Sequence, residues 1–344
     1  MIEFRIQHYL NRALQELSFL SRTSIAKPSS VIVVLTNSCN ARCLHCHSYK
    51  IEKNPRELTA KGWGKVFGEL RHWLGPVFLT LTGGEPLVRK DALSIVEHAT
   101  RNGFWVEFLT NGYAVDSAIA ERLIRSGVKR VTISMDSTSP DVHDKIRGRT
   151  GFHEKARNAI RMLVEQNRIQ GGDTAVRLKT AIMSLNLHDI VNIPPLAKEL
   201  GAEGVLYQAL EPVYYSGQFQ DENWFESNDL WIKDLAALDV SVGKIKSLKA
   251  DGYPVLNTAE NIDMIRHYFA DPKGLSRKVR TQQYKWKTKE CRSWLGLQIM
   301  PDGGMKMCHP MEPFANARDG ELVRSWESRS PCWKNRCEIL ERYF

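Results

Sequence analysis

The chain has 344 residues, of which 42% are hydrophobic and 25% charged, a balance typical of a folded globular protein and not of a disordered one. No apolar run approaches the ~20 residues that a membrane span needs, and the N-terminus lacks the apolar core of a secretory signal. The net charge of +9 fits solubility, an anionic substrate or transient nucleic-acid contact. We therefore expect a cytoplasmic protein whose seven cysteines serve metal ligation more than disulfides.

The N-terminal segment predicts an amphipathic helix, because Ile6, Leu10, Leu14 and Leu17 recur at helical spacing. A short apolar run at residues 31–35 follows and predicts a buried strand.

A polar turn after this strand carries Cys39, Cys43 and Cys46 in the spacing C-x3-C-x2-C. Three thiolates on one loop can converge on one metal centre, and soft thiolates favour iron–sulfur clusters or zinc. Three ligands are one fewer than usual, so a cubane held here would keep one iron open. A zinc loop would need a fourth protein ligand, which His45 or His47 could supply.

Strands and helices then alternate along the chain. Expected strands cover residues 77–81, 104–109, 130–135, 175–183 and 204–209, and expected helices cover residues 59–73, 90–101, 116–125, 152–166 and 187–200. This alternation predicts an α/β fold with a parallel sheet, and six βα units are enough for a partial (β/α)6 barrel. Such sheets carry their chemistry at the carboxyl ends of the strands.

Polar motifs follow the ends of these expected strands. They are Gly83-Gly84-Glu85-Pro86, Asn111, the pair Ser134 and Asp136, and the segment 208–211. Paired glycines let a backbone turn sharply and approach a ligand closely. The motifs and the cysteine loop are therefore expected at one edge of the sheet.

The cysteine spacing together with the Gly-Gly-Glu-Pro element resembles the radical S-adenosylmethionine (SAM) superfamily. The resemblance implies a six-unit partial barrel and a [4Fe-4S] cluster on Cys39, Cys43 and Cys46, with SAM chelated to the open iron. It further implies that an electron from the cluster splits SAM into methionine and a 5′-deoxyadenosyl radical, with a flavodoxin- or ferredoxin-type protein as electron donor.

The resemblance also implies contacts to SAM. Gly83, Gly84, Glu85 and Pro86 would hold its methionine amino group.

Ser134 and Asp136 would bind the ribose and neighbouring parts of SAM, and Asn111 is another recurrent family position. Arg147, in the segment His143 to Gly148, could pair with a carboxylate of SAM or substrate. Lys179 could reach the cofactor carboxylate.

Residues 212–290 are less regular, with helices expected over residues 221–249 and 258–269. A basic run between Arg277 and Arg292 includes Tyr284 and Trp286, a mixture that suits nucleic-acid contacts. We favour a solvated linker here, and so no nucleic-acid partner.

The C-terminal region predicts a β-hairpin at residues 295–308, with its turn at residues 301–304, and a helix at residues 321–327. The four remaining cysteines are Cys291, Cys308, Cys332 and Cys337. This pattern resembles the SPASM and Twitch auxiliary-cluster domains of radical SAM enzymes. It departs from a full SPASM domain, which has about seven cysteines, and its last pair is C-x4-C instead of C-x2-C. The resemblance implies one auxiliary [4Fe-4S] cluster; a structural zinc ribbon is the alternative.

These observations divide the chain into four parts. They are an N-terminal helix at residues 1–30, a partial barrel at 31–211, a helical linker or substrate region at 212–290, and a small hairpin and helix cluster domain at 291–344.

The expected activity is hydrogen-atom abstraction by a radical SAM oxidoreductase. If all seven cysteines are ligands, none remains to return a hydrogen atom, which favours dehydrogenation or crosslinking assisted by the auxiliary cluster. If the auxiliary cluster uses three, the spare cysteine, or a tyrosine, would make an epimerase credible.

The substrate is expected to be a natural-product intermediate, such as a sugar or nucleotide-linked compound, or a peptide. Only about thirty residues precede the first strand, so we expect no fused leader-binding domain, which favours a small molecule or a peptide presented by a separate protein. A non-catalytic zinc protein that binds nucleic acid through residues 277–292 is the alternative from another class. The Gly-Gly-Glu-Pro element and the clustering at strand ends argue against it.

Overall fold

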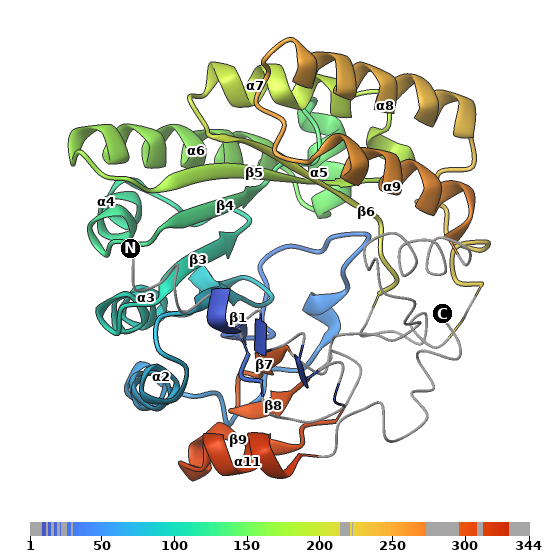
Figure 1. The fold of residues 1–344 in the computed structure, drawn as a ribbon. Helices are drawn as coiled ribbons and strands as arrows, with labels where there is room; N and C mark the ends of the chain where they lie inside the picture. Colours follow the sequence, from blue (N-terminus) through green and yellow to red (C-terminus); the bar gives the residue numbers. More distant parts are fainter. Residues whose placement is uncertain are drawn as a thin grey trace.

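The computed structural model describes residues 30–213, 223–272, 296–307 and 312–329, together with residue 221 and residues 9–11, 13, 14, 17, 18, 21 and 26–28. In this described part of the chain, nine strands form one sheet in the order β6-β5-β4-β3-β2-β1-β7-β8-β9 (Figure 1). The strands are β1 (Ser30–Val34), β2 (Phe78–Thr82), β3 (Trp105–Thr110), β4 (Arg130–Ser134), β5 (Ala175–Ile182), β6 (Gly204–Ala209), β7 (Leu297–Ile299), β8 (Gly304–Lys306) and β9 (Ala315–Asn316).

Strands β1 to β6 pair in parallel, each with its sequence neighbour. All six were predicted to within one residue at their starts and ends, and their alternation with helices was predicted as well. The carboxyl ends of parallel strands lie on one edge of a sheet, so the motifs that follow them share this edge. The predicted six-stranded parallel sheet is confirmed.

Helices follow the strands and cover the outer side of the sheet in Figure 1. The α-helices are α2 (Ala60–Leu74), α3 (Ala92–Arg101), α4 (Ser117–Arg125), α5 (Pro140–Arg147), α6 (Phe152–Ile169), α7 (Ile193–Glu199), α8 (Leu235–Ala250), α9 (Ala259–Ala270) and α11 (Leu322–Ser328). Short 3₁₀ turns are η1 (Ser48–Lys50), η2 (Pro86–Val88), η3 (Ser184–Asn186), η4 (Ile190–Asn192) and η7 (Ala317–Asp319). No described helix combines the length and apolar character that a membrane crossing requires.

The two faces of the sheet differ in polarity. On the outer face, Leu79, Leu81 and Phe108 are fully buried in the hydrophobic core beneath the helices. On the inner face, the strands carry the polar side chains Thr80, Glu107, Thr132, Ser134 and Lys179. Parallel strands covered on both faces are usually apolar throughout. The alternation seen here therefore identifies the inner face as a polar, partly open surface.

The predicted C-terminal hairpin is confirmed, with β7 and β8 antiparallel. It continues the main sheet, because β7 pairs in parallel with β1, with Val31 opposite Leu297. The Leu58 N–H also donates to the Pro301 carbonyl of the hairpin turn at 2.7 Å. The sheet thus joins the two ends of the described chain.

Two helix predictions were wrong in extent. Residues 223–234 form turns, and the expected helix at 221–249 begins only at Leu235, where the Asp234 side chain accepts a hydrogen bond from the Ala237 N–H. The helix expected at 187–200 starts as η4, and α7 begins at Ile193, because prolines at its second and third positions fit only a first turn. The segment around His143 to Gly148 contains α5, which the sequence reasoning did not predict as a helix.

The N-terminal segment is helical at its described positions, as expected. Its apolar stripe does not face the core, however, because Leu10 and Leu17 are 56% and 59% exposed. Asn11 and Ser18 are buried instead, and the Ser18 hydroxyl accepts a hydrogen bond from the Ala26 N–H at 2.7 Å. The apolar side of the predicted amphipathic helix is thus exposed at Leu10 and Leu17.

Arg89 connects the end of β1 to the start of α2. Its guanidinium donates to the Leu35 carbonyl at 2.8 Å and to the Leu58 carbonyl at 2.7 Å. It also forms ion pairs with Asp91 at 2.9 Å and with Glu57 at 3.4 Å, where both the Arg89 and Glu57 side chains are only 9% exposed. The strand that leads into the cysteine loop is thus fixed by a nearly buried charge network.

We expect Arg89→Ala to lower the free energy of unfolding by about 3–5 kcal/mol, because it leaves Glu57 buried without its cation. Arg101→Ala is the matched control. Arg101 pairs with Glu97 across one helical turn but is 68% exposed, so its loss should cost less than about 1 kcal/mol. Urea unfolding of both variants measures the difference; equal losses would contradict the assignment.

Candidate active site

The Gly-Gly-Glu-Pro element packs directly on the residues that lead into the cysteine loop. The Leu35 N–H donates to the Thr82 carbonyl at 2.7 Å, the Gly84 N–H to the Thr36 carbonyl at 2.8 Å, and the Glu85 N–H to the Ser38 carbonyl at 2.9 Å. The pairing of β1 with β2 thus continues beyond both strands. The residue next to Cys39 is fixed by this continued pairing.

Both glycines are required by this packing. A Cβ on Gly83, which has a φ of 151°, would lie 2.4 Å from the Thr36 carbonyl oxygen, and a Cβ on Gly84 would lie 2.4 Å from that of Ser38. Real Cβ atoms do not approach so closely. The close approach expected of these glycines is therefore, in this structure, an approach to the chain's own backbone.

The Glu85 carboxylate lies behind this turn and is 1% exposed. One oxygen accepts from the Thr110 hydroxyl at 2.7 Å and the Leu87 N–H at 3.0 Å, and the other from the Asn111 N–H at 2.7 Å. Burial raises the pKa of Glu85, while the hydrogen bonds from Asn111 and Thr110 oppose the rise. The second oxygen has capacity for a further donor.

Asn111 extends these contacts to the cysteine loop. Its side-chain amide donates to the Asn40 side-chain oxygen at 2.7 Å and accepts from the Tyr113 N–H at 3.0 Å. Asn40 lies between the first two cysteines, and the sequence reasoning did not single it out. No spacing rule marks it, because its partner is 71 residues away.

The three cysteines of the loop gather around a small buried cluster. Cys43 is 7% exposed and packs with Ala41 and Phe152, and Cys39 and Cys46 pack against this group. All three thiols are free. Within the described residues, no three His, Cys, Asp or Glu side chains converge on a point suited to a single metal ion.

Electrostatics at the loop oppose three bare thiolates. Burial raises the pKa of Cys39 to about 12, against a hydrogen bond from the Ala41 N–H, and neighbouring Cys43 and Glu85 add to the rise. Burial also raises the pKa of Cys43, although Arg147 lowers it. Ionised thiols at this site therefore require a cationic partner, which is what an iron centre supplies. The donor set fits an iron–sulfur cluster in this respect.

The end of α5 lies against the same loop. The Arg42 N–H donates to the Arg147 carbonyl and the Leu44 N–H to the Ile146 carbonyl, both at 2.9 Å. Gly148 ends the helix with a φ of 69°, and a Cβ there would lie 2.3 Å from the Arg42 carbonyl oxygen. This contact requires glycine both for its backbone conformation and for the space.

Asp136 and Arg147 form a buried ion pair behind Cys43. Their side chains are 0% and 9% exposed, and Arg147 Nη2 lies 2.6 Å from Asp136 Oδ2. Arg147 Nη1 donates to Cys43 Sγ at 3.7 Å. Asp136 also accepts from the Ala181 N–H at 3.0 Å through its other oxygen. One carboxylate oxygen of Asp136 thus accepts a hydrogen bond, and the other forms the ion pair with Arg147 but has no hydrogen-bond partner.

These charges hold each other in the ionised form. Burial alone would raise the pKa of Asp136, but Arg147 brings it below its usual value. For Arg147, burial opposes the charge, whereas Asp136 and Cys43 raise its pKa above the usual range.

Other polar groups of the described site have no protein partner. Ser134 and Lys179 are register partners on β4 and β5, so they project from one face of the sheet, and neither side chain has a hydrogen bond or ion pair within the described residues. His45 Nδ1 is buried without a partner, and burial lowers the pKa of this imidazole to about 4. An unpaired buried polar atom is uncommon. Ser134 and Lys179 are therefore available to a ligand on the inner face.

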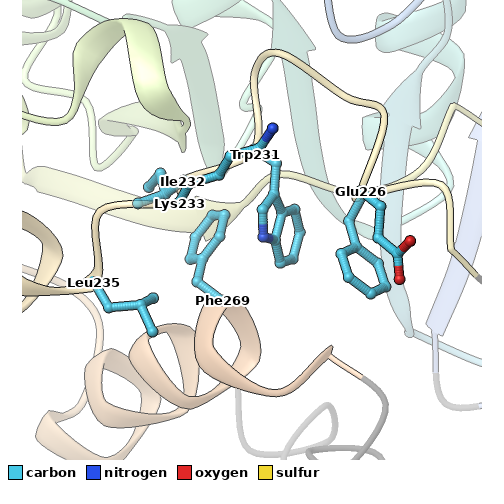
Figure 2. A pocket seen from close by; sticks show the side chains of 7 residues that line it. Glu226, Trp231, Ile232, Lys233, Leu235 and Phe269 are labelled. Atoms are coloured by element: carbon cyan, nitrogen blue, oxygen red, sulfur yellow. The ribbon is translucent and has the colours of Figure 1, made fainter.

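A separate cavity of about 390 Å³ lies between the segment that leads into α8 and helix α9 (Figure 2). Its walls include the aromatic rings of Phe225, Trp231 and Phe269. The loop that carries Trp231 is attached to the strand end, because the Ser184 N–H donates to the Leu230 carbonyl at 2.9 Å. Residues 223–234, expected as helix, thus contribute an aromatic pocket near the end of β5 instead.

Most of the predicted site residues of the barrel are therefore close together in the fold. Hydrogen bonds or packing contacts join the three cysteines, the Gly-Gly-Glu-Pro element and Asn111. Arg147 contacts Cys43, and Asp136 pairs with Arg147 behind it. The predicted auxiliary ligands Cys291, Cys308, Cys332 and Cys337 lie outside the described residues, as does the basic run at 277–292.

Comparisons with known proteins point to one enzyme family. Residues 33–178 match the family model of the radical SAM superfamily. The chain is 27% identical over 311 residues to AdoMet-dependent heme synthase of Methanosarcina barkeri, which covers 88% of this chain and 82% of that protein. It is 25% identical over 320 residues to PqqA peptide cyclase of Rhodopseudomonas palustris, over 92% of this chain and 76% of the relative.

Among solved structures, Streptococcus suis SuiB bound to S-adenosylmethionine superposes with a TM-score of 0.68 at 14% identity, covering 95% of this chain and 72% of SuiB. This likeness concerns the fold. Residues 33–178, which carry the strand-end site, therefore match the radical SAM superfamily, so we identify this part of the chain as that of a radical SAM enzyme.

Proposed function

We propose that Cys39, Cys43 and Cys46 bind the [4Fe-4S] cluster and that the enzyme abstracts a hydrogen atom from a peptide substrate. The observation that supports the first part most is the packing of three free thiols on one buried cluster beside the Gly-Gly-Glu-Pro turn. When bound, the cluster and SAM supply the 5′-deoxyadenosyl radical, and the protein positions this radical and excludes water.

The residues of the chain divide into those that face the ligand and those that support the loop. Ser134, Lys179 and the second oxygen of Glu85 retain hydrogen-bonding capacity, so they suit the ribose, the carboxylate and the ammonium group of SAM respectively. Pro86 starts η2, and Gly83 and Gly84 form the turn that places Glu85.

The other predicted SAM ligands have supporting contacts of their own. Asn111 binds Asn40, and Asp136 binds Arg147. We therefore propose that Asn111, Asp136 and Arg147 act on SAM chiefly by holding the loop and the cluster in place.

We propose one auxiliary [4Fe-4S] cluster on Cys291, Cys308, Cys332 and Cys337. The support is their pairing in the sequence and the confirmed hairpin between the first two. If all seven cysteines are ligands, oxidation with electron transfer to the auxiliary cluster is favoured, as in dehydrogenation or crosslinking. Epimerisation requires a spare cysteine or a tyrosine as hydrogen donor. A flavodoxin- or ferredoxin-type protein would supply the reducing electron.

A peptide substrate is favoured over the sugar or nucleotide-linked compound expected from the sequence. The match to PqqA peptide cyclase spans most of both chains. The aromatic cavity at Phe225, Trp231 and Phe269, with Glu226 and Lys233 among its lining residues, suits an apolar side chain with polar groups nearby (Figure 2). A small-molecule substrate is the second candidate, because the match to heme synthase covers 82% of that relative.

After anaerobic reconstitution, we expect about eight iron and eight acid-labile sulfide per chain, the content of two [4Fe-4S] clusters. The triple variant C39A/C43A/C46A should retain about four of each, because only the auxiliary site remains. Iron and sulfide analysis of both proteins measures this. Unchanged iron in the triple variant would exclude these ligands, and bound zinc in place of iron would favour a structural metal site.

We expect Gly84→Ala to weaken SAM binding roughly tenfold or more, because overpacking costs about 1–3 kcal/mol and the added Cβ must displace the Ser38 carbonyl next to Cys39. Gly68→Ala is the control. Gly68 lies in α2 with open space around it, so this change should stabilise the helix by about 0.5–1 kcal/mol and leave SAM binding unchanged. Equilibrium dialysis with labelled SAM decides the outcome; wild-type affinity in Gly84→Ala would contradict the argument.

A further inference from the structure

We propose that the Arg147–Asp136 pair sets the reduction potential of the cluster, with Arg147 raising it and Asp136 lowering it. The inference rests on the proposed ligation by Cys43. It concerns a role different from the one that the sequence suggested for Arg147, which was to pair with a carboxylate of SAM or substrate.

The geometry directs one guanidinium toward one thiol. Arg147 Nη1 donates to Cys43 Sγ at 3.7 Å, and Nη2 is held by Asp136 at 2.6 Å. The Arg147 carbonyl also accepts from the Arg42 N–H next to Cys43 at 2.9 Å. Backbone and side chain of the same residue therefore fix the distance between the cation and the sulfur.

The position of Asp136 is equally constrained. It is fully buried, its second oxygen accepts from the Ala181 N–H on β5, and its own N–H donates to His143 Nδ1 at 3.1 Å. Burial lowers the pKa of His143 to about 3, so this ring adds no positive charge near neutral pH. The charged groups of the described structure that adjoin Cys43 are thus Arg147 and, behind it, Asp136.

Charge arithmetic gives the direction of each effect. Reduction adds one negative charge to the cluster, and a nearby buried cation stabilises that form more than the oxidised form. A hydrogen bond to a ligating sulfur acts in the same direction. Arg147 therefore raises the potential, and the Asp136 carboxylate, which lies behind it, partly offsets this. Removing one partner alone should shift the potential, with opposite sign for the two partners.

The test is an anaerobic redox titration without SAM, monitored by electron paramagnetic resonance. The signal to follow is that of the cluster that binds SAM, and it is recognised because its spectrum changes when SAM is added afterwards. At the potential that is the wild-type midpoint, we expect the ratio of reduced to oxidised cluster to be tenfold lower or more in Arg147→Gln. A tenfold change corresponds to a midpoint potential about 59 mV more negative for a one-electron reduction. Arg147→Lys keeps the charge and should recover most of the wild-type midpoint.

Arg149→Gln is the matched control, because Arg149 is exposed just beyond the end of α5. It removes the same unit of charge from a position that solvent screens, so the midpoint should not move. Asp136→Asn should shift the midpoint toward positive potential. The opposite signs separate an electrostatic effect from general damage to the fold, which would move both variants alike.

Several outcomes would overturn the inference. A wild-type midpoint in Arg147→Gln together with weaker SAM binding would assign Arg147 to the SAM carboxylate instead. Shifts of the same sign in Arg147→Gln and Asp136→Asn would assign the pair a purely structural role. If Arg147→Gln does not retain iron, the other two variants decide. Arg147→Lys should then keep most of the wild-type midpoint, and Asp136→Asn should shift the midpoint toward positive potential. Absence of any cluster in the wild-type protein would instead refute the proposed function.

Discussion

Backbone pairing beyond the ends of β1 and β2 is the constraint on which the site depends. Residues 36–38 continue one strand and Gly83 to Glu85 continue the other, and no side chain can be accommodated between them. Cys39 follows directly, so the cysteine loop starts from a fixed position. Arg89 stabilises the same strand end through the Leu35 carbonyl. The turn is thus a structural part of the loop, in addition to any contact that it makes with SAM.

Charge is the second constraint, because the site buries thiols beside a carboxylate and a cation. Three ionised sulfurs at this location are unfavourable without added positive charge. Iron would supply most of this charge, and Arg147 supplies a further unit next to Cys43. Asp136 keeps that arginine in place at the cost of a buried negative charge. Because α5 carries Arg147, the position of this helix affects how readily the proposed cluster accepts an electron.

Sequence reasoning located the site because its signals are local. Strand periodicity placed β1 to β6, and the polar residues at their ends followed from the rule for parallel sheets. Contacts between distant segments were not predictable in this way. Arg147 reaches Cys43 across 104 residues and Asn111 reaches Asn40 across 71, and neither pairing leaves a spacing pattern. Residues 223–234 were predicted as helix, whereas they form turns whose aromatic residues pack as the wall of a cavity.

The most direct test of the central claim is the reductive cleavage of SAM by the reconstituted protein. With dithionite as electron source, we expect 5′-deoxyadenosine and methionine to accumulate in equal amounts, detected by liquid chromatography and mass spectrometry. Both products should be absent when Cys39, Cys43 and Cys46 are replaced by alanine. Equal production by wild-type and variant proteins, or none by a wild-type protein that contains its full iron, would contradict the account.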